Sequence, residues 1–293
     1  MHRQLIVNGD DFGLTPGVNS AISECARDGV LRSATLMANG PAFDDAVRKA
    51  KDTDRLGVGI HFTLTGLKPL SEPGRLPVLA AGNGRLPSSL SALIDIALVR
   101  KEARGEIRRE LFAQAEKVFD SGIVPTHFDS HKHVHILPVV VDVLIEIAER
   151  YSVKWIRKPF EDPRSIRFFA DVEEGSRGGF LKQYLRALCS RPAHCLFRSR
   201  IAKSGLRTPD YFHGLSSTGV LSERVMARLA ESVKPGINEL MVHPGYLDAE
   251  LRAMNSRLSL SREREREILV SEDTKSLMEN RAIQLIHYGE VKL

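Results

Sequence analysis

The segment that says most about the architecture of this chain spans ten residues, Thr126-His127-Phe128-Asp129-Ser130-His131-Lys132-His133-Val134-His135. It holds four of the ten histidines of the chain together with a carboxylate. Imidazole and carboxylate groups are ligands of divalent metals. Similar polar groups follow short apolar runs at residues 7–13, 57–62 and 240–245. The four segments together indicate one metal-dependent hydrolytic site assembled from the ends of several strands.

Short apolar runs alternate with amphipathic stretches along the chain. The runs predict strands at residues 4–8, 33–37, 57–62, 126–129, 153–157, 209–213, 238–242 and 282–286. The amphipathic stretches predict helices at residues 16–28, 43–51, 89–120 with a break near Gly105, 138–151, 221–233 and 261–280. Residues 67–87 predict a long loop, and residues 163–207 predict helical excursions. The charge run from Glu263 to Glu267 is interpreted as a solvated face of the last helix.

This alternation predicts an α/β fold with a parallel sheet and helical crossovers. The polar groups follow the first, third, fourth and penultimate predicted strands. In a (β/α) barrel all strand ends meet at one face, whereas distant strands of an open sheet converge less readily. We therefore expect an irregular barrel, similar to a TIM barrel, with about seven or eight strands. No internal repeat or low-complexity linker interrupts the sequence, which favours a single domain over residues 1–293.

The composition narrows the class of protein. Apolar residues make up 42% and charged residues 27% of the chain, as in ordinary soluble domains. The net charge of +5 is mild, so we expect a solvated basic surface and no nucleic-acid partner. No apolar run is long enough for a signal peptide or a membrane span. Three widely spaced cysteines fit reduced thiols, and a cytoplasmic location is predicted.

Four motifs resemble the YdjC-like carbohydrate deacetylase family, whose relatives include the chitooligosaccharide deacetylases. They are Ile6-Val7-Asn8-Gly9-Asp10-Asp11-Phe12-Gly13-Leu14, Gly59-Ile60-His61-Phe62-Thr63-Leu64-Thr65, residues 125–135, and Val242-His243-Pro244-Gly245. Their order and spacing match over most of the chain. The segment Tyr211-Phe212-His213-Gly214-Leu215 is also similar to the hopanoid-biosynthesis-associated branch of the family.

The resemblance implies a distorted barrel of the polysaccharide-deacetylase (glycoside hydrolase/deacetylase) kind, with a divalent metal held by Asp11, His61 and His131. Three protein ligands leave positions open for water and for a substrate oxygen. One carboxylate and two imidazoles suit Zn, Mn, Co or Fe, and Mg less naturally because Mg prefers oxygen. Family members are described with Mg, so Mg and Zn both stay open.

The resemblance also implies that Asp10 is the general base and that His243 is the general acid of an amide hydrolysis. Two adjacent aspartates share a site only where a strand gives way to a loop, because successive side chains of a strand alternate in direction. Other readings are an N-cap pair for the two aspartates and a turn residue for His243. His61 could likewise be only a hydrogen-bonded histidine at a strand end.

Further polar residues are candidates for orienting ligands or contacting substrate. Asp129 is expected to orient a ligand histidine by contacting the ring nitrogen that does not face the metal. His127 is expected to support the fold and not to bind the metal. The other candidates for such contacts are His133, His135, Arg157 and His213. Arg157 could steady Asp10, hold a sugar hydroxyl or form a surface ion pair, and the aromatic residues at 211–212 could wall a sugar pocket or pack in the core.

The expected reaction is removal of an N-acetyl group from an amino sugar, as an oligosaccharide or a hopanoid-linked glycolipid. Two histidines and a carboxylate also form the facial triad of iron oxygenases, and a non-catalytic metal or sugar-binding module is the third possibility. The segment 163–207 interleaves basic and apolar residues, so it is a candidate lid, subunit interface or peripheral membrane contact. A homodimer is expected from the family resemblance.

Overall fold

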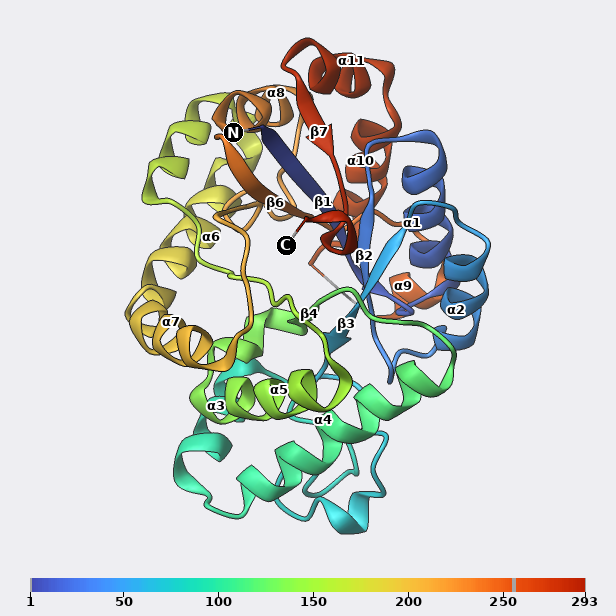
Figure 1. Ribbon diagram of the computed structural model, residues 1–293, viewed down its shortest axis with the longest axis vertical. Helices are drawn as coiled ribbons and strands as arrows, with labels where there is room; N and C mark the ends of the chain where they lie inside the picture. Colours follow the sequence, from blue (N-terminus) through green and yellow to red (C-terminus); the bar gives the residue numbers. More distant parts are fainter. Residues whose placement is uncertain (1, 255–256, 293) are drawn as a thin grey trace.

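A parallel sheet of seven strands forms the centre of the molecule (Figure 1). The structure is a computed structural model, which describes residues 2–254 and 257–292. The spatial order is β4-β3-β2-β1-β6-β5, with β7 paired to β1 beside this path. The strands are β1 (Arg3–Phe12), β2 (Ser33–Leu36), β3 (Gly57–Phe62), β4 (Phe128–Ser130), β5 (Tyr211–His213), β6 (Gly236–Val242) and β7 (Ile283–Leu285).

Helices surround this sheet (Figure 1). They are α1 (Pro16–Asp28), α2 (Phe43–Lys51), α3 (Leu90–Val99), α4 (Ala103–Asp120), α5 (Pro138–Tyr151), α6 (Arg177–Ser190), α7 (Pro192–Ser204), α8 (Glu223–Ser232), α9 (Ala249–Ala253), α10 (Ser259–Val270) and α11 (Glu272–Asn280). Short 3-10 helices lie at η1 (Pro73–Arg75), η2 (His131–Ile136), η3 (Pro163–Asp171), η4 (Glu174–Ser176) and η5 (Tyr288–Glu290).

The sheet curls into a half-barrel, which confirms the expectation of an irregular barrel. All pairings of the named strands are parallel, as the alternation of strands and helices predicts. Between β4 and β5 the sheet continues only through single bridges, Phe128 with Ile156 and Trp155 with Arg207. The strand predicted at 153–157 is therefore reduced to two bridging residues, and this is where the barrel is irregular.

Several element boundaries match their predictions because local signals specify them. Helix α1 begins where Pro16 occupies its first turn and the Thr15 hydroxyl accepts a hydrogen bond from the Val18 amide, 3.2 Å away. The predicted bounds of α2, β3 and α5 are also those of the structure. Strand β3 is buried on both faces, as expected for a strand covered by helices on one side and by the barrel interior on the other.

Two long predicted helices are each split in the structure. Residues 89–120 form α3 and α4, but the break falls at residues 100–102, and Gly105 lies inside α4. The chain becomes extended at Arg100, with φ −104° and ψ 108°. Residues 261–280 divide at Ser271, whose hydroxyl accepts a hydrogen bond from the Thr274 amide and so caps α11. No helix in the described part of the chain is both long and apolar enough to cross a bilayer.

Candidate metal centre and catalytic site

A backbone irregularity in β1 brings two neighbouring aspartates to one site. Asp11 has a left-handed backbone with φ 66°, and the register of β1 against β2 shifts between Gly9 and Phe12. Such a bulge breaks the alternation of side-chain directions. Asp10 and Asp11 therefore each have a carboxylate oxygen within 4.8 Å of a His61 ring nitrogen. The two aspartates therefore share a site through this bulge within the last residues of β1. The predicted transition from strand to loop comes only after Phe12.

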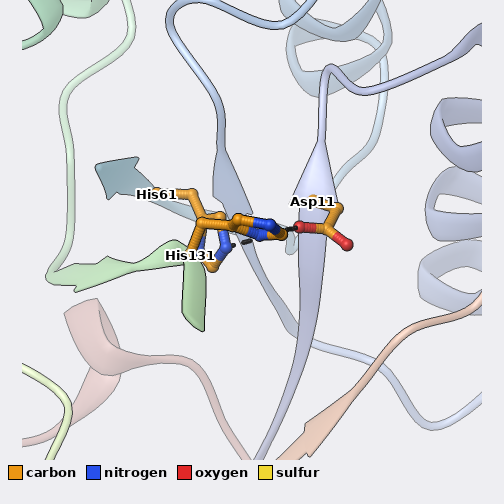
Figure 2. Close-up of side chains that lie close together, drawn as sticks. All are labelled: Asp11, His61 and His131. Carbon is orange, nitrogen blue, oxygen red and sulfur yellow. Dashed lines mark hydrogen bonds and ion pairs between the residues drawn. The ribbon is translucent and has the colours of Figure 1, made fainter. Parts of the chain in front are cut away.

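Three side chains from separate elements converge as the metal-ligand prediction requires (Figure 2). The Nδ1 atom of His131 lies 3.0 Å from Oδ1 of Asp11, and Nε2 of His61 lies 3.4 Å from the same oxygen. The ligand atoms of the three residues all lie within 4.8 Å of one another. Asp11 and His61 are buried, whereas the His131 side chain is 27% exposed, so the group is open to solvent on the His131 side.

The surroundings of His61 orient its Nε2 atom toward Asp11. Its other ring nitrogen, Nδ1, lies 2.7 Å from Oδ1 of Asp129 and 3.1 Å from the hydroxyl of Thr35. The Thr35 hydroxyl also donates to Oδ2 of Asp129 over 3.1 Å. A carboxylate behind a histidine fixes the ring tautomer and orientation in metal sites. Asp129 thus occupies the place expected for it, and Thr35 is an additional contact that the motifs did not indicate.

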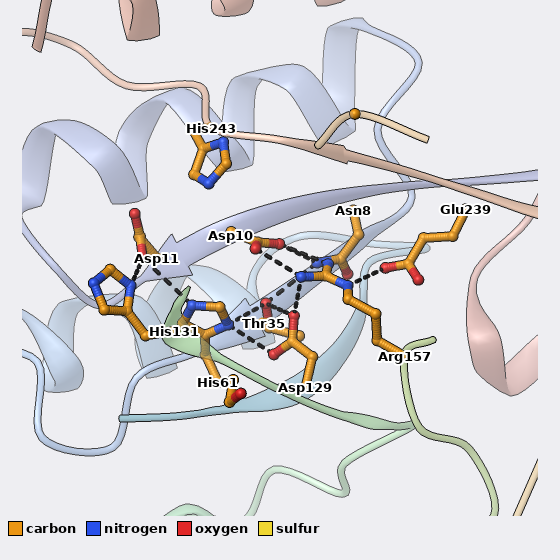
Figure 3. A network of polar contacts seen from close by, with 12 residues as sticks. Asn8, Asp10, Asp11, Thr35, His61, Asp129, His131, Arg157, Glu239 and His243 are labelled. Carbon is orange, nitrogen blue, oxygen red and sulfur yellow. Dashed lines mark hydrogen bonds and ion pairs between the residues drawn. The ribbon is translucent and has the colours of Figure 1, made fainter. Parts of the chain in front are cut away.

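Arg157 connects the two sides of the site (Figure 3). Its two terminal nitrogens each donate to a different oxygen of Asp10, both over 2.7 Å. One of them also lies 2.6 Å from Oδ2 of Asp129, and Nε donates to Glu239 over 2.7 Å. The guanidinium is fully buried, so its position is fixed by these three carboxylates. Asn8 adds a hydrogen bond of 2.9 Å to Asp10.

The charges of the site are consistent with an additional bound cation. Burial alone would raise the pKa of Asp10, but the Arg157 guanidinium outweighs it and holds that pKa well below the usual range. Burial would lower the pKa of His61, yet Asp129 and Asp11 raise it to about 10. Four buried carboxylates, those of Asp10, Asp11, Asp129 and Glu239, thus share two buried arginines, Arg157 and Arg262, and a proton on His61. A divalent metal would replace that proton, so the residues present fit a metal.

The second buried arginine is Arg262 of α10, which pairs with Oδ2 of Asp11. This contact leaves Oδ1 of Asp11 to face the two histidines. Burial would raise the pKa of Asp11, but Arg262 and then His131 keep it well below the usual range. The solvated helix face predicted for residues 263–267 is therefore wrong for Glu265, which is buried like its neighbour Arg262. Arg262, Glu265 and Ile268 follow one another at intervals of three residues, which is the spacing of one helix face. This spacing is the feature of the sequence that indicates a buried face.

His243 follows β6 and lies near both aspartates (Figure 3). Its backbone amide donates to Oε2 of Glu265 over 2.6 Å, which ties the end of β6 to α10. The Nδ1 atom of its ring has no hydrogen-bond partner among residues 2–254 and 257–292. Burial lowers the pKa of His243 to about 4 and raises that of Glu265 to about 7. The imidazole is thus neutral near pH 7.

The remaining histidines of the predicted set lie around the site and not among the three ligands. His127 stacks on Tyr288 with ring centroids 3.8 Å apart. His135 contacts the Ser130 hydroxyl at 2.5 Å and the Arg157 carbonyl oxygen at 3.2 Å. His133 has a left-handed backbone and packs edge-on against His135 and Phe212.

His213 lies at a different place in the fold. Its Nε2 atom is 3.3 Å from the Asn238 side-chain oxygen, and burial lowers its pKa to about 4. With Tyr211 and Phe212 it lines a cavity of about 920 Å³ that also includes Arg3 and Lys234. None of the three proposed metal ligands lines this cavity. A role for His213 in contacting substrate stays a prediction.

Comparison with known proteins gives the family. The model of the YdjC-like protein family matches residues 4–280. The chain belongs to this family. It is 36% identical to a carbohydrate deacetylase of Geobacillus stearothermophilus over 99% of this chain and 98% of that one. A carbohydrate deacetylase of Thermoanaerobacter pseudethanolicus is 32% identical over 99% of this chain and 100% of its own length.

A solved structure supports the same fold. A cellobiose-phosphate cleavage protein from Enterococcus faecalis, so named with its crystal structure, superimposes with a TM-score of 0.77 at 26% identity. The match covers 100% of both chains. Membership of the YdjC-like family therefore agrees with the half-barrel and with the four motifs that carried the resemblance.

Proposed function

We propose that this chain is a metal-dependent carbohydrate deacetylase that removes the N-acetyl group from an amino sugar. Its YdjC-like relatives named carbohydrate deacetylase support the class of reaction. The observation that carries the proposal is the placement of Asp10 and His243 beside the group of Asp11, His61 and His131 (Figure 3). A base, an acid and three metal donors are the groups that metal-dependent amide hydrolysis uses.

Oδ1 of Asp11, Nε2 of His61 and Nδ1 of His131 are the atoms that would hold the cation. When bound, a divalent metal supplies positive charge that polarises a carbonyl and stabilises a developing oxyanion. Two nitrogen donors and one oxygen donor favour Zn, Mn, Co or Fe over Mg. Arg262 holds the second oxygen of Asp11, which favours binding through a single oxygen.

In this proposal Asp10 receives a proton from the attacking water. The carboxylate is ionised at neutral pH and can accept a proton, and its lowered pKa means that it also gives this proton up readily. Oδ2 of Asp10 accepts one hydrogen bond from Arg157 and keeps a lone pair for the water. Arg157 is a positioning residue, because its two donors fix both oxygens of Asp10 in one plane.

His243 is proposed to deliver a proton to the departing amine. The imidazole is neutral near pH 7, so it gains the proton during the cycle, and Asp10 is the nearby group that has taken one from water. The products are acetate and a free amino sugar. The facial-triad oxygenase leaves Asp10 and His243 without roles, and a sheet of parallel strands is not the double-stranded β-helix of those enzymes.

Replacement of Asp10 by Asn tests the proposal. We expect the rate of acetate release to fall by at least about a hundredfold. The substrates are a panel of acetylated oligosaccharides, and mass spectrometry detects the reaction as a mass loss of about 42 Da. Metal content should be retained, because Asp10 is not among the three ligands. Asp44→Asn, at an exposed position of α2, is the matched control and should not change the rate.

Unchanged turnover in Asp10→Asn would refute the base assignment, and absence of acetate release from the parent would support a non-catalytic module. Release that requires oxygen and 2-oxoglutarate would favour the oxygenase. The similarity of residues 211–215 to the hopanoid-associated branch extends the proposal to an amino sugar carried on a lipid. A homodimer and a cytoplasmic location stay predictions.

A further inference from the structure

The chain concentrates its positive charge in one part of the fold. Residues 163–207, which comprise η3, η4, α6 and α7, are called the basic flank here. They hold ten Lys and Arg against three Asp and Glu, a net charge of +7, whereas the whole chain carries +5. The rest of the chain, with 32 basic and 34 acidic residues, therefore carries −2. Helices α6 and α7 lie along the opposite side of the molecule from α1 and α2 (Figure 1).

Most of this charge is not neutralised within the described structure. Of the ten cations, only Arg200 forms an ion pair with a carboxylate there, with Asp142 at 2.8 Å. Two of the three acidic residues of the basic flank pair with arginines outside it. Asp171 lies 2.9 Å from Arg228, and Glu173 contacts Arg264. Nine of the ten cations of the flank therefore have no carboxylate partner among the described residues and are available to an anionic partner.

The same part of the fold exposes large apolar side chains. They are Ile166 at 39% exposure, Phe169 at 36%, Leu181 at 43%, Leu185 at 51% and Leu196 at 54%. Single exposed apolar residues are ordinary on protein surfaces. Five of them fall within one segment of 45 residues that also holds nine cations without a carboxylate partner, and this combination is the basis for inferring an interaction surface.

Helix α6 shows how the two kinds of side chain are combined. Its buried face carries Phe180, Gln183 and Ala187. Leu181 and Leu185 are four residues apart and lie one above the other on the exposed side. Lys182 and Arg186 are exposed beside them. An exposed apolar ridge bordered by cations is the arrangement of helices that lie in the interface of an anionic membrane.

We propose that the basic flank binds the surface of an anionic lipid bilayer. Cations next to the bilayer attract acidic headgroups, and the leucines enter the headgroup region. A second copy of the chain is disfavoured because a symmetric contact would bring two surfaces of +7 together. Nucleic acid is disfavoured because it offers much less apolar surface to the exposed leucines than a bilayer does. The inference goes beyond the deacetylase proposal and does not depend on it.

Flotation of the full chain with lipid vesicles tests the proposal. We expect recovery with vesicles of phosphatidylcholine mixed with phosphatidylglycerol, little recovery with phosphatidylcholine alone, and weaker binding as salt increases. The double variant Leu181→Ser/Leu185→Ser and the double variant Lys182→Glu/Arg186→Glu should each lower the partition coefficient about tenfold or more. All four positions are exposed, so circular dichroism and thermal melting should match the parent.

Matched controls lie outside the basic flank. Leu260→Ser changes a residue that is 76% exposed on α10, and Lys101→Glu/Arg104→Glu makes the same charge change at exposed positions of the α3–α4 region. These variants should bind vesicles as the parent does. Equal recovery with and without anionic lipid would overturn the proposal. So would loss of binding in the controls alone, salt-sensitive oligonucleotide binding without vesicle binding, or association of the chain with itself that the leucine variant abolishes.

Discussion

At the scale of single residues, the buried charges of the site each have a fixed partner. Arg157 holds both oxygens of Asp10, and Arg262 holds the oxygen of Asp11 that faces away from the histidines. Asp129 fixes His61 from behind. Losing one partner of a buried pair leaves the other charge uncompensated, which costs more free energy than the pair contributes in net terms.

This arrangement predicts an effect of Arg262→Met that depends on metal. In the presence of a chelator, the free energy of unfolding should fall by about 3–5 kcal/mol, because the buried charge of Asp11 loses its guanidinium partner. Added Zn should recover part of this loss by compensating the same carboxylate. Urea unfolding with and without metal measures both values. Arg264→Met, two residues along α10 and paired only at the surface, is the control and should change stability little.

An equal loss of stability with and without metal would show that Arg262 acts on packing and not through Asp11. The residue also shows a limit of sequence reasoning. The motifs indicate Asp11, His61 and His131, because metal ligands of this kind appear in the sequence as Asp and His residues that directly follow apolar runs. Arg262 and Thr35 carry no such pattern, and their contacts with the site join segments far apart in the chain.

At the scale of elements, the site depends on the close approach of β3 to the segment before β4. Gly59 lies two residues before His61, and a Cβ atom there would come within 2.4 Å of Cε1 of His127 and 2.7 Å of its carbonyl oxygen. The backbone at His127 cannot withdraw without disturbing the β3–β4 pairing, in which His61 lies opposite Asp129. Gly59 is therefore required for the contact that orients His61.

We predict that Gly59→Ala lowers the free energy of unfolding by about 2 kcal/mol through overpacking and weakens metal binding through displacement of His61. Gly105→Ala is the matched change in α4, where an added Cβ meets no atom within 4 Å. It should stabilise the fold by about 0.5–1 kcal/mol because alanine is the better helix former. Denaturant titration and calorimetric metal binding check both. A Gly59→Ala variant as stable as the parent would contradict the close approach.

Elements with local signals were predictable, whereas those formed by distant contacts were not. Thr15 and Pro16 specify the start of α1 from within the sequence. The single bridges at Trp155 and Ile156 depend on backbone pairing with Arg207 and Phe128, which are distant in sequence. The apolar run at 153–157 therefore predicts a strand where only bridges form. The bulge at Asp11 likewise depends on pairing with β2. The four motifs predicted the barrel class because they recur at strand ends.

At the scale of the whole molecule, several buried histidines must stay neutral for the chain to fold. Burial lowers the pKa of His135 to about 3 and that of His213 to about 4. In the unfolded chain a histidine has a pKa of about 6.5 and binds a proton readily. The stability that depends on these neutral histidines is therefore fully present above about pH 6.5. It is lost as the pH falls from there toward the lowered pKa values.

His213→Gln should reduce this loss, since it removes one titrating group away from the proposed metal ligands. Between pH 7 and pH 5 the free energy of unfolding of the parent should fall by about 2 kcal/mol more than that of the variant. The reason is that the pKa of His213 is about 6.5 in the unfolded chain and about 4 in the folded one. Urea unfolding at the two pH values measures this difference. The same pH dependence in both proteins would contradict the assignment. A single domain over residues 1–293 stays a prediction at this scale.

The most direct test of the central claim is the metal content of the purified chain and of Asp11→Ala after both are exposed to Zn and desalted. Elemental analysis should find about one divalent ion per parent chain and almost none in the variant, because Asp11 faces both histidines. Equal metal content in the two proteins, or none in the parent, would contradict a centre formed by Asp11, His61 and His131.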